Sequence, residues 1–217
     1  MIVTIDGGVA SGKSAVGRRV AEALGLPFAD SGLMYRAITR LASERGIDPR
    51  DADALTRLSE STELKIDGER IWADGVELTD GIYDADHAEA LPLVSAAPGV
   101  RRALVTQQRR SGASGVVMAG RDIGTVVFPD ADVKFFLVAS PDEKVRRRAA
   151  QFERRGERVD EEAMRKEVAE RDRVDTQRAV APLRPAPDAV VIDTDRLDIE
   201  QVVDIILRHI HERSAAR

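Results

Sequence analysis

An apolar run near the start of the chain leads directly into a glycine-rich loop, Ile2-Val3-Thr4-Ile5-Asp6-Gly7-Gly8-Val9-Ala10-Ser11-Gly12-Lys13-Ser14. The second half of this stretch matches the pattern G-x-x-x-x-G-K-[ST] at every fixed position. The context is also the required one, because a strand-like run precedes the loop and residues 14–24 have the spacing of an amphipathic helix. We therefore predict a phosphate-binding loop between a buried strand and a helix.

The residue types of this loop suit a nucleoside triphosphate. Gly7 and Gly12 let the backbone curl so that successive N–H groups face a polyphosphate, and the following helix presents its positive end to it. Lys13 is predicted to reach the β and γ phosphates, and the Ser14 hydroxyl to bind Mg²⁺ as a cofactor. The predicted residues for ATP, the co-substrate, are Gly7, Gly8, Val9, Ala10, Ser11, Gly12, Lys13, Ser14 and Ala15.

The loop alone does not choose among regulatory GTPases, motor ATPases and small-molecule kinases, which all share it. The chain contains no Asn, so the Asn-Lys-x-Asp motif with which GTPases read their base cannot be present. There is also no obvious second strand ending in Asp-Glu, of the type expected in many motors. The short chain of 217 residues favours a small kinase.

Short apolar runs alternate with helical segments along the rest of the chain. The predicted strands cover residues 2–5, 26–28, 116–119, 133–138 and 189–192, and the predicted helices cover 14–24, 33–45, 99–110, 142–154, 161–173 and 199–213. This alternation predicts an α/β fold of three layers, a P-loop fold in which helices flank a parallel sheet. The length suits one domain over residues 1–217.

Residues 62–97 break this pattern. Between Leu64 and Leu78, apolar and polar residues alternate, and Asp67-Gly68 and Asp74-Gly75 are turn signals. We predict small antiparallel hairpins here, in an insertion that packs beside the main sheet.

A second group of candidate residues follows the second predicted strand, in Asp30-Ser31-Gly32-x-x-Tyr35-Arg36. Ser31 is placed to cap a helix that begins at Gly32, and Tyr35 and Arg36 lie one turn further on. A helix N-terminus with an adjacent arginine suits a second anion. The alternative is a capped helix with an arginine on its surface.

A third group follows the strand at 116–119, in Ala119-Gly120-Arg121-Asp122-Ile123-Gly124-Thr125-Val126-Val127-Phe128-Pro129. Ligands of open α/β sheets bind outside the carboxyl ends of strands, where Arg121 and Asp122 are expected. The arginine can hold an acceptor phosphate and the carboxylate can accept from an exocyclic amine, while Gly120 and Gly124 permit close backbone approach. The alternative is an Arg–Asp turn pair of little energetic weight.

Two arginine-rich segments complete the candidates. Arg146-Arg147-Arg148 and Arg154-Arg155-Gly156-Glu157-Arg158 predict a helical hairpin over about 146–162 that could close over phosphates as a lid, although a solvated helix face explains most single arginines. Further on, Arg171, Asp175 and Arg178 have the spacing of one helix face. They suit a ribose and phosphates, or equally a surface salt-bridge ladder.

The composition limits the possible binding partners and the possible chemistry of the chain. The net charge of −5 argues against a general nucleic-acid binder, and the absence of Cys excludes disulfides and thiol chemistry. No apolar run approaches the ~20 residues of a membrane span, and no signal segment precedes the first strand. We expect a cytoplasmic monomer without nucleic-acid or membrane partners. His87, His209 and His211 lack ligand spacing and are expected to be ordinary surface residues.

With these motifs in place, the chain resembles the bacterial cytidylate kinases, in the nucleoside monophosphate kinase family, from Ile2 to about His211. The most specific signal is the run Gly120–Pro129. The others are Ile5-Asp6-Gly7, the Asp30–Arg36 motif, Pro98-x-Val100-Arg101, and Glu170-Arg171-Asp172-x-x-Asp175-x-x-Arg178 followed by Ala179-x-Ala181-Pro182-Leu183.

The resemblance implies transfer of the ATP γ-phosphoryl group to CMP or dCMP, without a covalent enzyme intermediate. It implies that Arg36 and Arg121 hold the acceptor phosphate and that Arg101 and Asp122 read the cytosine edge. Tyr35, Arg171 and Asp175 would surround the sugar, with Arg178 near the phosphates. The implied acceptor residues are Ser31, Tyr35, Arg36, Arg101, Arg121, Asp122, Arg171, Asp175 and Arg178, and the catalytic ones are Lys13, Arg121 and Arg178.

Three positions depart from the family pattern. Pro92 stands where the family often has a base-reading Ser, three positions before Ser95, and proline has neither a hydroxyl nor an N–H. Gly8 replaces a common Pro, and Ala119 stands where an Asp often precedes the Gly-Arg-Asp run. The 62–97 insertion resembles the acceptor-binding insertion of the long bacterial form.

Two other functions remain open. One is a different small-molecule kinase, such as a shikimate- or gluconate-type enzyme, whose acceptor region is typically helical and which lacks the Gly-Arg-Asp-Ile-Gly-Thr run. The other is a non-enzymatic module that binds ATP for regulation.

Overall fold

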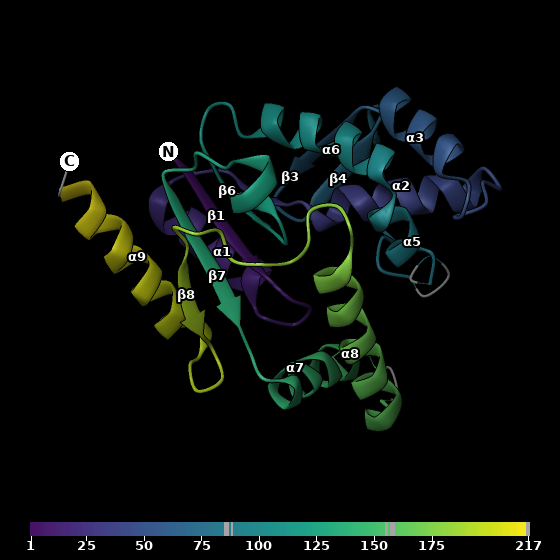
Figure 1. The fold of residues 1–217 in the computed structure, drawn as a ribbon. Helices are drawn as coiled ribbons and strands as arrows, with labels where there is room; N and C mark the ends of the chain where they lie inside the picture. Colours follow the sequence, from purple (N-terminus) through teal and green to yellow (C-terminus); the bar gives the residue numbers. More distant parts are fainter. Residues whose placement is uncertain (85–86, 88, 155, 157–158, 216–217) are drawn as a thin grey trace.

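The computed structural model describes residues 1–84, 87, 89–154, 156 and 159–215. Its main sheet is parallel, with the strand order β2-β6-β1-β7-β8 (Figure 1). The strands are β1 (Ile2–Gly7), β2 (Phe28–Asp30), β6 (Val116–Gly120), β7 (Val133–Val138) and β8 (Val190–Asp193). The predicted parallel α/β sheet is confirmed, and the second strand begins after Pro27, which has no N–H to donate to a neighbouring strand.

Six helices of the described residues lie close to their predicted ranges, whereas the helices at 52–61 and 91–96 were not predicted, and the second of these lies in the 62–97 segment for which hairpins were expected. The helices are α1 (Lys13–Leu24), α2 (Gly32–Glu44), α3 (Ala52–Ser61), α5 (Leu91–Ala96), α6 (Pro98–Ser111), α7 (Pro141–Glu153), α8 (Glu161–Gln177) and α9 (Ile199–Ala215), with a short π-helix η1 (Ile123–Val127). Helix α3 is an element to which the sequence patterns assigned no structure. The Asp51 side chain caps it by accepting from Ala54 N at 2.9 Å.

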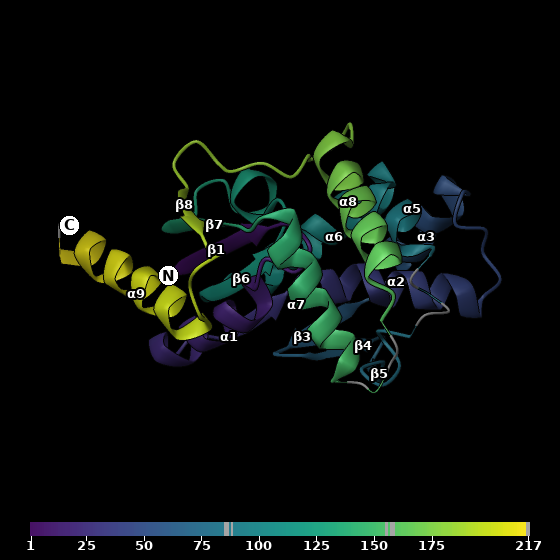
Figure 2. The same ribbon diagram turned by 90° about the horizontal axis from the view of Figure 1, so that it is seen from below.

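The side chains of the central strands alternate between the two faces of the sheet. Val3, Ile5 and Val117 belong to the core formed with α1 and α9, whereas Val116 and Met118 pack with η1 on the opposite face. Figure 2 shows α1 and α9 together on one side of the strands, and Val105 of α6 packs against the cluster on the opposite face. Burial on both faces explains why these strands are apolar throughout.

The register of the main sheet aligns the carboxyl ends of three strands. In the parallel ladders, Asp6 of β1 is opposite Gly120 of β6, and Asp30 of β2 is opposite Ala119. Strands β1, β2 and β6 therefore end at nearly the same height along the sheet. The three sequence motifs begin where these strands end, so the fold places them around one site.

The predicted hairpins are confirmed as a second, antiparallel sheet of β3 (Leu64–Asp67), β4 (Arg70–Ala73) and β5 (Val76–Glu77). Gly68, Asp74 and Gly75 all have positive φ, as tight two-residue turns require. The first turn is attached to the main sheet, because Gly68 N donates to Phe28 O at 3.3 Å.

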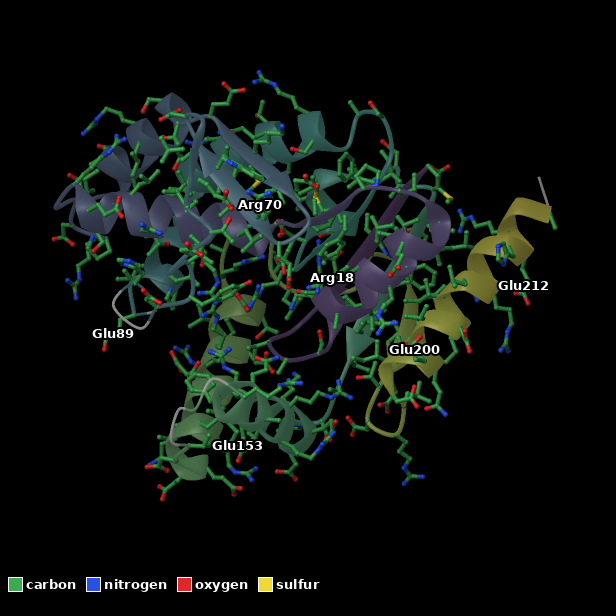
Figure 3. The ribbon with its side chains drawn as sticks, turned by 180° about the vertical axis from the view of Figure 1, so that it is seen from behind. Arg18, Arg70, Glu89, Glu153, Glu200 and Glu212 are labelled. Carbon is green, nitrogen blue, oxygen red and sulfur yellow. The ribbon has the colours of Figure 1, made fainter. Side chains whose placement is uncertain are left out.

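A separate apolar core holds this small sheet against helices α2, α3, α5 and α6, with Met34, Ile38, Leu55, Ile71 and Leu104 at its centre. Figure 3 shows Arg18 on α1 and Arg70 on the small sheet; Arg18 pairs with Glu69 in the first turn. The predicted insertion thus shares its core with helices outside it, and its boundaries at 62 and 97 stay a prediction.

Helices α7 and α8 form the predicted helical hairpin and lie side by side (Figure 2). Ser140 and Asp160 cap their N-termini, accepting from Glu143 N at 3.3 Å and from Glu162 N at 3.0 Å. Val145, Met164 and Val168 form the small core between them. The predicted residues Arg155, Glu157 and Arg158 lie outside the described residues.

Candidate active site

The loop between β1 and α1 has the curled backbone predicted for phosphate binding. Gly12 has φ of +88° and Ala10 has φ of +52°, so both lie in the left-handed region. Gly7 is different, since it ends β1 and does not have a positive φ. A Cβ at Gly7 would lie 2.7 Å from the carbonyl oxygen of Leu137. Glycine is therefore needed at position 7 because a side chain would not fit there. The predicted role of Gly7 in curling the backbone was wrong.

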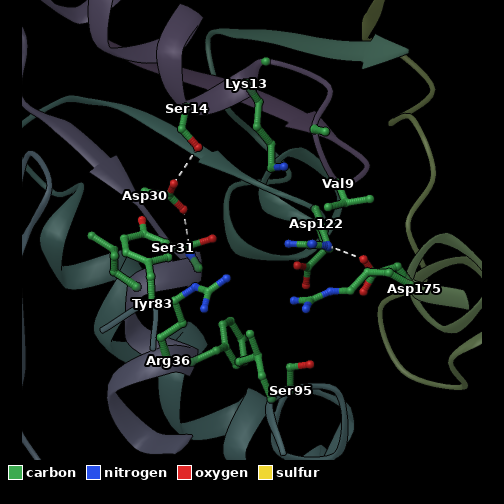
Figure 4. A pocket seen from close by; sticks show the side chains of 18 of the residues that line it. Val9, Lys13, Ser14, Asp30, Ser31, Arg36, Tyr83, Ser95, Asp122 and Asp175 are labelled. Atoms are coloured by element: carbon green, nitrogen blue, oxygen red, sulfur yellow. Dashed lines mark hydrogen bonds and ion pairs between the residues drawn. The ribbon is translucent and has the colours of Figure 1, made fainter. Parts of the chain in front are cut away.

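Lys13 points into the mouth of this loop, where its Nζ donates to Gly8 O at 2.9 Å (Figure 4). Burial, together with the nearby Arg121 cation, lowers the pKa of Lys13 to about 8. A cation held out of water beside another cation is stabilised by a bound anion. The loop and its lysine are thus arranged to receive negative charge.

Ser14 and Asp30 connect the phosphate loop to the second motif. The Ser14 hydroxyl donates to Asp30 Oδ2 at 2.6 Å, and Gly32 N donates to Asp30 Oδ1 at 2.9 Å (Figure 4). Ser31 occupies the N-cap position of α2 but makes no capping hydrogen bond through its side chain. The predicted Ser31 cap was therefore wrong, and Asp30 binds the first N–H of the helix instead.

Five buried or half-buried side chains from separate segments form a charged network at the floor of the site. Arg101 of α6 pairs with Asp122, and Arg121 pairs with Asp175 of α8. Arg178 lies between the two carboxylates, with nitrogen–oxygen distances of 3.5 Å to Asp122 and 3.7 Å to Asp175. Arg121 and Asp122 are thus not paired with each other, and the group of Arg171, Asp175 and Arg178 is not a surface ladder.

This network carries more positive than negative charge, since three arginines share two carboxylates. Burying charges costs several kcal/mol per ion unless partners compensate, so such clusters are maintained where function needs them. Within the described residues, Arg101 Nε and Arg178 Nη2 are buried without a hydrogen-bond partner. Donors of this kind are available to a ligand.

Arg36, Arg148 and Arg171 add further cations above the network. Burial lowers the pKa of Arg171 to about 10, and the neighbouring arginines, Arg121 first among them, lower it as well. Burial likewise lowers the pKa of Arg36. Mutual repulsion among half-buried arginines is relieved when an anion binds between them.

One cavity unites the loop and the arginine clusters. Among the described residues, seven cationic side chains line it against four carboxylates, although the whole chain is acidic. All nine residues predicted for the acceptor line this cavity, namely Ser31, Tyr35, Arg36, Arg101, Arg121, Asp122, Arg171, Asp175 and Arg178. The loop contributes Val9, Ala10, Gly12, Lys13, Ser14 and Ala15, whereas the predicted residues Gly7, Gly8 and Ser11 are not among the lining residues.

The residues that line this cavity without having been assigned a site role from the sequence include Asp30, Tyr83, Ser95 and Arg148. Asp30 had a usable signal, because it ends a strand just before the Ser31-Gly32 motif. Tyr83 and Ser95 have no spacing that distinguishes them. Arg148 was included only as one of several lid arginines.

The lid arginines differ in what they contact. Arg146 is 71% exposed and pairs with Glu143, and Arg147 donates to Glu143 and to the Thr194 carbonyl oxygen. Arg148 faces the cavity and also pairs with Glu167 at 3.1 Å. The helical hairpin is therefore present, and closure over phosphates stays a prediction.

A buried carboxylate outside the cavity braces the site. Asp6 accepts from Ile123 N at 2.9 Å and from Gly124 N at 2.8 Å, the two N–H groups directly after Arg121 and Asp122. Burial raises the pKa of Asp6 to about 7, although these two N–H groups pull it the other way. Gly124 allows the close approach, because a Cβ there would lie 2.8 Å from Thr4 Oγ1.

The loop, the parallel sheet and a second cation-rich site in the same cavity define a P-loop kinase. The family model described as cytidylate kinase matches residues 3–212. The chain belongs to the cytidylate kinase family, which confirms the family predicted from its motifs.

The similar proteins agree with this assignment. The cytidylate kinase of Pelotomaculum thermopropionicum is 44% identical, covering 96% of this chain and 95% of that protein, and the cytidylate kinase of Mycobacterium avium is 42% identical over 99% and 96%. A bifunctional pantoate ligase/cytidylate kinase of Synechococcus is 46% identical over 99% of this chain. This chain spans only 42% of the Synechococcus protein.

Solved structures support the fold. Shikimate kinase from Bacteroides thetaiotaomicron has a TM-score of 0.51 at 12% identity, with 97% of this chain and 98% of that chain covered. An uncharacterized protein from Eubacterium ventriosum has a TM-score of 0.53 at 14% identity, covering 97% and 98%. In the described part of the chain, none of the helices combines the length and apolar character needed to cross a membrane.

Proposed function

We propose that this chain transfers the γ-phosphoryl group of ATP to CMP or dCMP, giving ADP and CDP or dCDP. The observation that carries the proposal is the single cavity in which the phosphate loop faces a second, arginine-rich site. Family membership supports the choice of a cytidine nucleotide as acceptor. The bifunctional relatives support the same activity for the segment that this chain matches.

The donor half of the reaction belongs to the loop. Its N–H groups and the N-terminus of α1 bind the β and γ phosphates, and Lys13 exchanges Gly8 O for phosphate oxygens. As the bond from the γ-phosphorus to the β–γ bridging oxygen breaks, negative charge develops on that oxygen. Lys13 is placed to stabilise this charge, which is why it is assigned as catalytic.

Ser14 and Asp30 fit a magnesium ion. Both offer hard oxygen atoms at the mouth of the phosphate loop, and they already contact each other at 2.6 Å. Mg²⁺ usually takes one or two protein oxygens and completes its shell with water and substrate phosphates, so a larger acidic cluster is not required. When bound, the ion supplies positive charge to the transferring phosphate. Ser14 and Asp30 would hold it from the protein side.

The acceptor half belongs to the arginine clusters. Arg36 and Arg121 hold the CMP phosphate, whose oxygen attacks the γ-phosphorus, and we assign Arg178, which lines the same cavity, to the developing charge. Asp175 and Arg171 bind the sugar, together with Tyr35. Positioning and electrostatic stabilisation carry the reaction, because no covalent enzyme intermediate is required.

Base recognition uses Arg101 and Asp122, which are buried as a pair beneath Tyr35. Pro92 offers the base no hydroxyl, and we assign that role to Ser95, one helical turn further along α5. Ser95 lines the cavity, its hydroxyl donates to Pro92 O at 3.2 Å, and its carbonyl accepts from Arg101 at 2.9 Å. Ser95 is therefore in direct contact with the base-reading arginine through its backbone carbonyl.

The α7–α8 hairpin closes over the phosphates as a lid in this proposal, with Arg148 as the arginine that reaches them. Arg148 lines the active-site cavity and also a neighbouring cavity toward α8, and its buried Nε has no hydrogen-bond partner among the described residues. A cytoplasmic location and a monomeric state accompany the proposal as expectations.

A coupled assay of ADP release with CMP, dCMP, UMP, AMP, dTMP and shikimate tests the function. We expect the highest kcat/KM with CMP or dCMP. Equal activity on all nucleotides, or a preference for shikimate, would contradict the proposal. ATP binding without turnover of any acceptor would favour the regulatory module instead.

A further inference from the structure

Arg36 has an aromatic partner that the proposed reaction has not yet used. Its guanidinium carbon lies 4.5 Å from the centre of the Tyr83 ring, at one end of the cavity (Figure 4). Both side chains line this cavity, and both also line a neighbouring cavity of about 1030 Å³ toward α8. Within the described residues, no carboxylate forms an ion pair with Arg36.

Helix α2 anchors the segment that carries Tyr83. Arg40 lies one turn after Arg36 on this helix, and its Nη1 donates to the carbonyl oxygens of Leu78 at 3.2 Å and Asp80 at 2.6 Å. One helix thus provides the arginine that is stacked and the arginine that holds the stacking segment. The separation of Arg36 and Tyr83 therefore depends on helix α2.

The backbone between this anchor and Tyr83 follows a tight turn. Gly81 has φ of +73°, and a Cβ at this position would lie 2.8 Å from Asp84 Oδ2. Asp84 N donates to Gly81 O at 3.0 Å and closes the turn. Tyr83 lies within this turn and is 44% exposed, so part of its side chain faces solvent while its ring contacts Arg36.

An aromatic partner affects Arg36 differently from a carboxylate. A carboxylate would occupy the hydrogen-bonding edge of the guanidinium and neutralise its charge. A ring contacts the flat face, attracts the cation and leaves the N–H groups free for a phosphate. Arg36 also lies near Arg121 and Arg148, whose charges would otherwise push its flexible side chain away from the site.

We infer that Tyr83 is a positioning residue, whose ring holds the Arg36 guanidinium in the orientation that receives the acceptor phosphate. The inference rests on the proposed function and adds to it a residue outside the motifs. Holding an arginine in its binding geometry before the ligand arrives lowers the entropic cost of binding. The effect therefore falls on acceptor affinity, and the chemical step is unchanged.

The test compares Tyr83→Leu with Tyr83→Phe. We expect Tyr83→Leu to raise the KM for CMP by roughly tenfold, the order of a partly desolvated cation–π contact, while kcat and the KM for ATP change less than twofold. Tyr83→Phe retains the ring and should behave like the unaltered chain. An unchanged KM in Tyr83→Leu, or an equal loss in Tyr83→Phe, would overturn the inference.

Arg36→Ala and Arg70→Ala complete the design. In the Arg36→Ala background, Tyr83→Leu should have no further effect on the KM, because its partner is gone; additive losses would mean that Tyr83 acts elsewhere. Arg70→Ala is the matched control, since Arg70 stacks on Trp72 at 4.8 Å on the small sheet (Figure 3) and is not among the residues that line either cavity. It should leave the KM for CMP unchanged.

Calorimetry with inorganic phosphate separates this inference from the proposed function. Phosphate binding that is weakened in Tyr83→Leu but not in Tyr83→Phe would support the stacking role even if the chain did not phosphorylate CMP. Equal phosphate affinity in both variants would count against the role of Tyr83, whatever the acceptor is. Thermal unfolding of each variant verifies that the fold is intact.

Discussion

Arg121 and Asp175 are 54 positions apart in the chain, and their side chains form a buried ion pair at the floor of the cavity. The pair joins the end of β6 to helix α8, so it connects the main sheet to the helical hairpin. Asp175 also lies 3.7 Å from Arg178, and it is therefore surrounded by cations.

Asp175→Asn should weaken the acceptor site and the fold together. Removing one partner of a buried pair leaves an uncompensated charge and costs about 3–5 kcal/mol. We expect the Tm to fall and kcat/KM for CMP to drop by roughly a hundredfold or more, while the KM for ATP changes little. Glu170→Gln, an exposed change on the same helix, should alter neither quantity, and normal activity of Asp175→Asn would refute a role at the sugar.

Lys13→Ala should reduce kcat by several orders of magnitude and leave the fold intact. The lost cation stabilises charge that develops only in the transition state, so ground-state binding of ATP should weaken less than turnover. Steady-state kinetics and circular dichroism measure the two effects, with the exposed Lys166→Ala as the control. Near-normal turnover without Lys13 would contradict the mechanism.

ATP binding should be linked to proton uptake by Lys13. The pKa of this lysine is lowered from 10.5 to about 8 in the free protein, so part of the population is neutral at pH 8.5. Phosphate oxygens favour the charged form, hence binding raises the pKa and takes up protons at pH 8.5 but hardly at pH 6.5. Calorimetry in buffers of different ionisation enthalpy measures the uptake, and Lys13→Met should abolish it.

Ser95→Ala should reduce the discrimination between CMP and UMP. One hydrogen bond contributes about 1 kcal/mol, so we expect a roughly fivefold rise in the KM for CMP and an unchanged kcat. Asp122→Ala should show a larger loss of discrimination, because it also leaves Arg101 without its carboxylate. If Ser95→Ala retains full CMP selectivity, a residue other than Ser95 supplies the hydroxyl that Pro92 does not have.

Local patterns were sufficient to predict most of the fold. The strand at 133–138 was predicted at its observed bounds, because an uninterrupted apolar run buried on both faces has a clear signature. Helix α3 was missed because Leu55 and Leu58 are its only fully buried apolar residues among many polar ones. Asp51, the residue that caps this helix, is a start signal for a helix, but several other polar residues surround it and made the signal hard to recognise.

The candidate site was predictable as a set of motifs and not as a set of contacts. The phosphate loop, Arg36 and Arg121 have characteristic neighbours in sequence, so they could be found. Which carboxylate pairs with which arginine depends on segments far apart in the chain, and spacing carries no information about such pairs. Tyr83 lies in a turn whose path is set by Arg40, which is 40 positions away from Asp80.

The two hydrogen bonds to Asp6 connect the phosphate loop to the segment after β6 within the main sheet. Asp6 directly precedes the phosphate loop and accepts from Ile123 N and Gly124 N, which follow Arg121 and Asp122, so one carboxylate ties the phosphate loop to the segment that carries the proposed acceptor arginine. Neither bond involves α7 or α8. The main sheet therefore fixes the distance between the two proposed phosphate sites, and closure of the hairpin, if it occurs as proposed, would leave that distance unchanged.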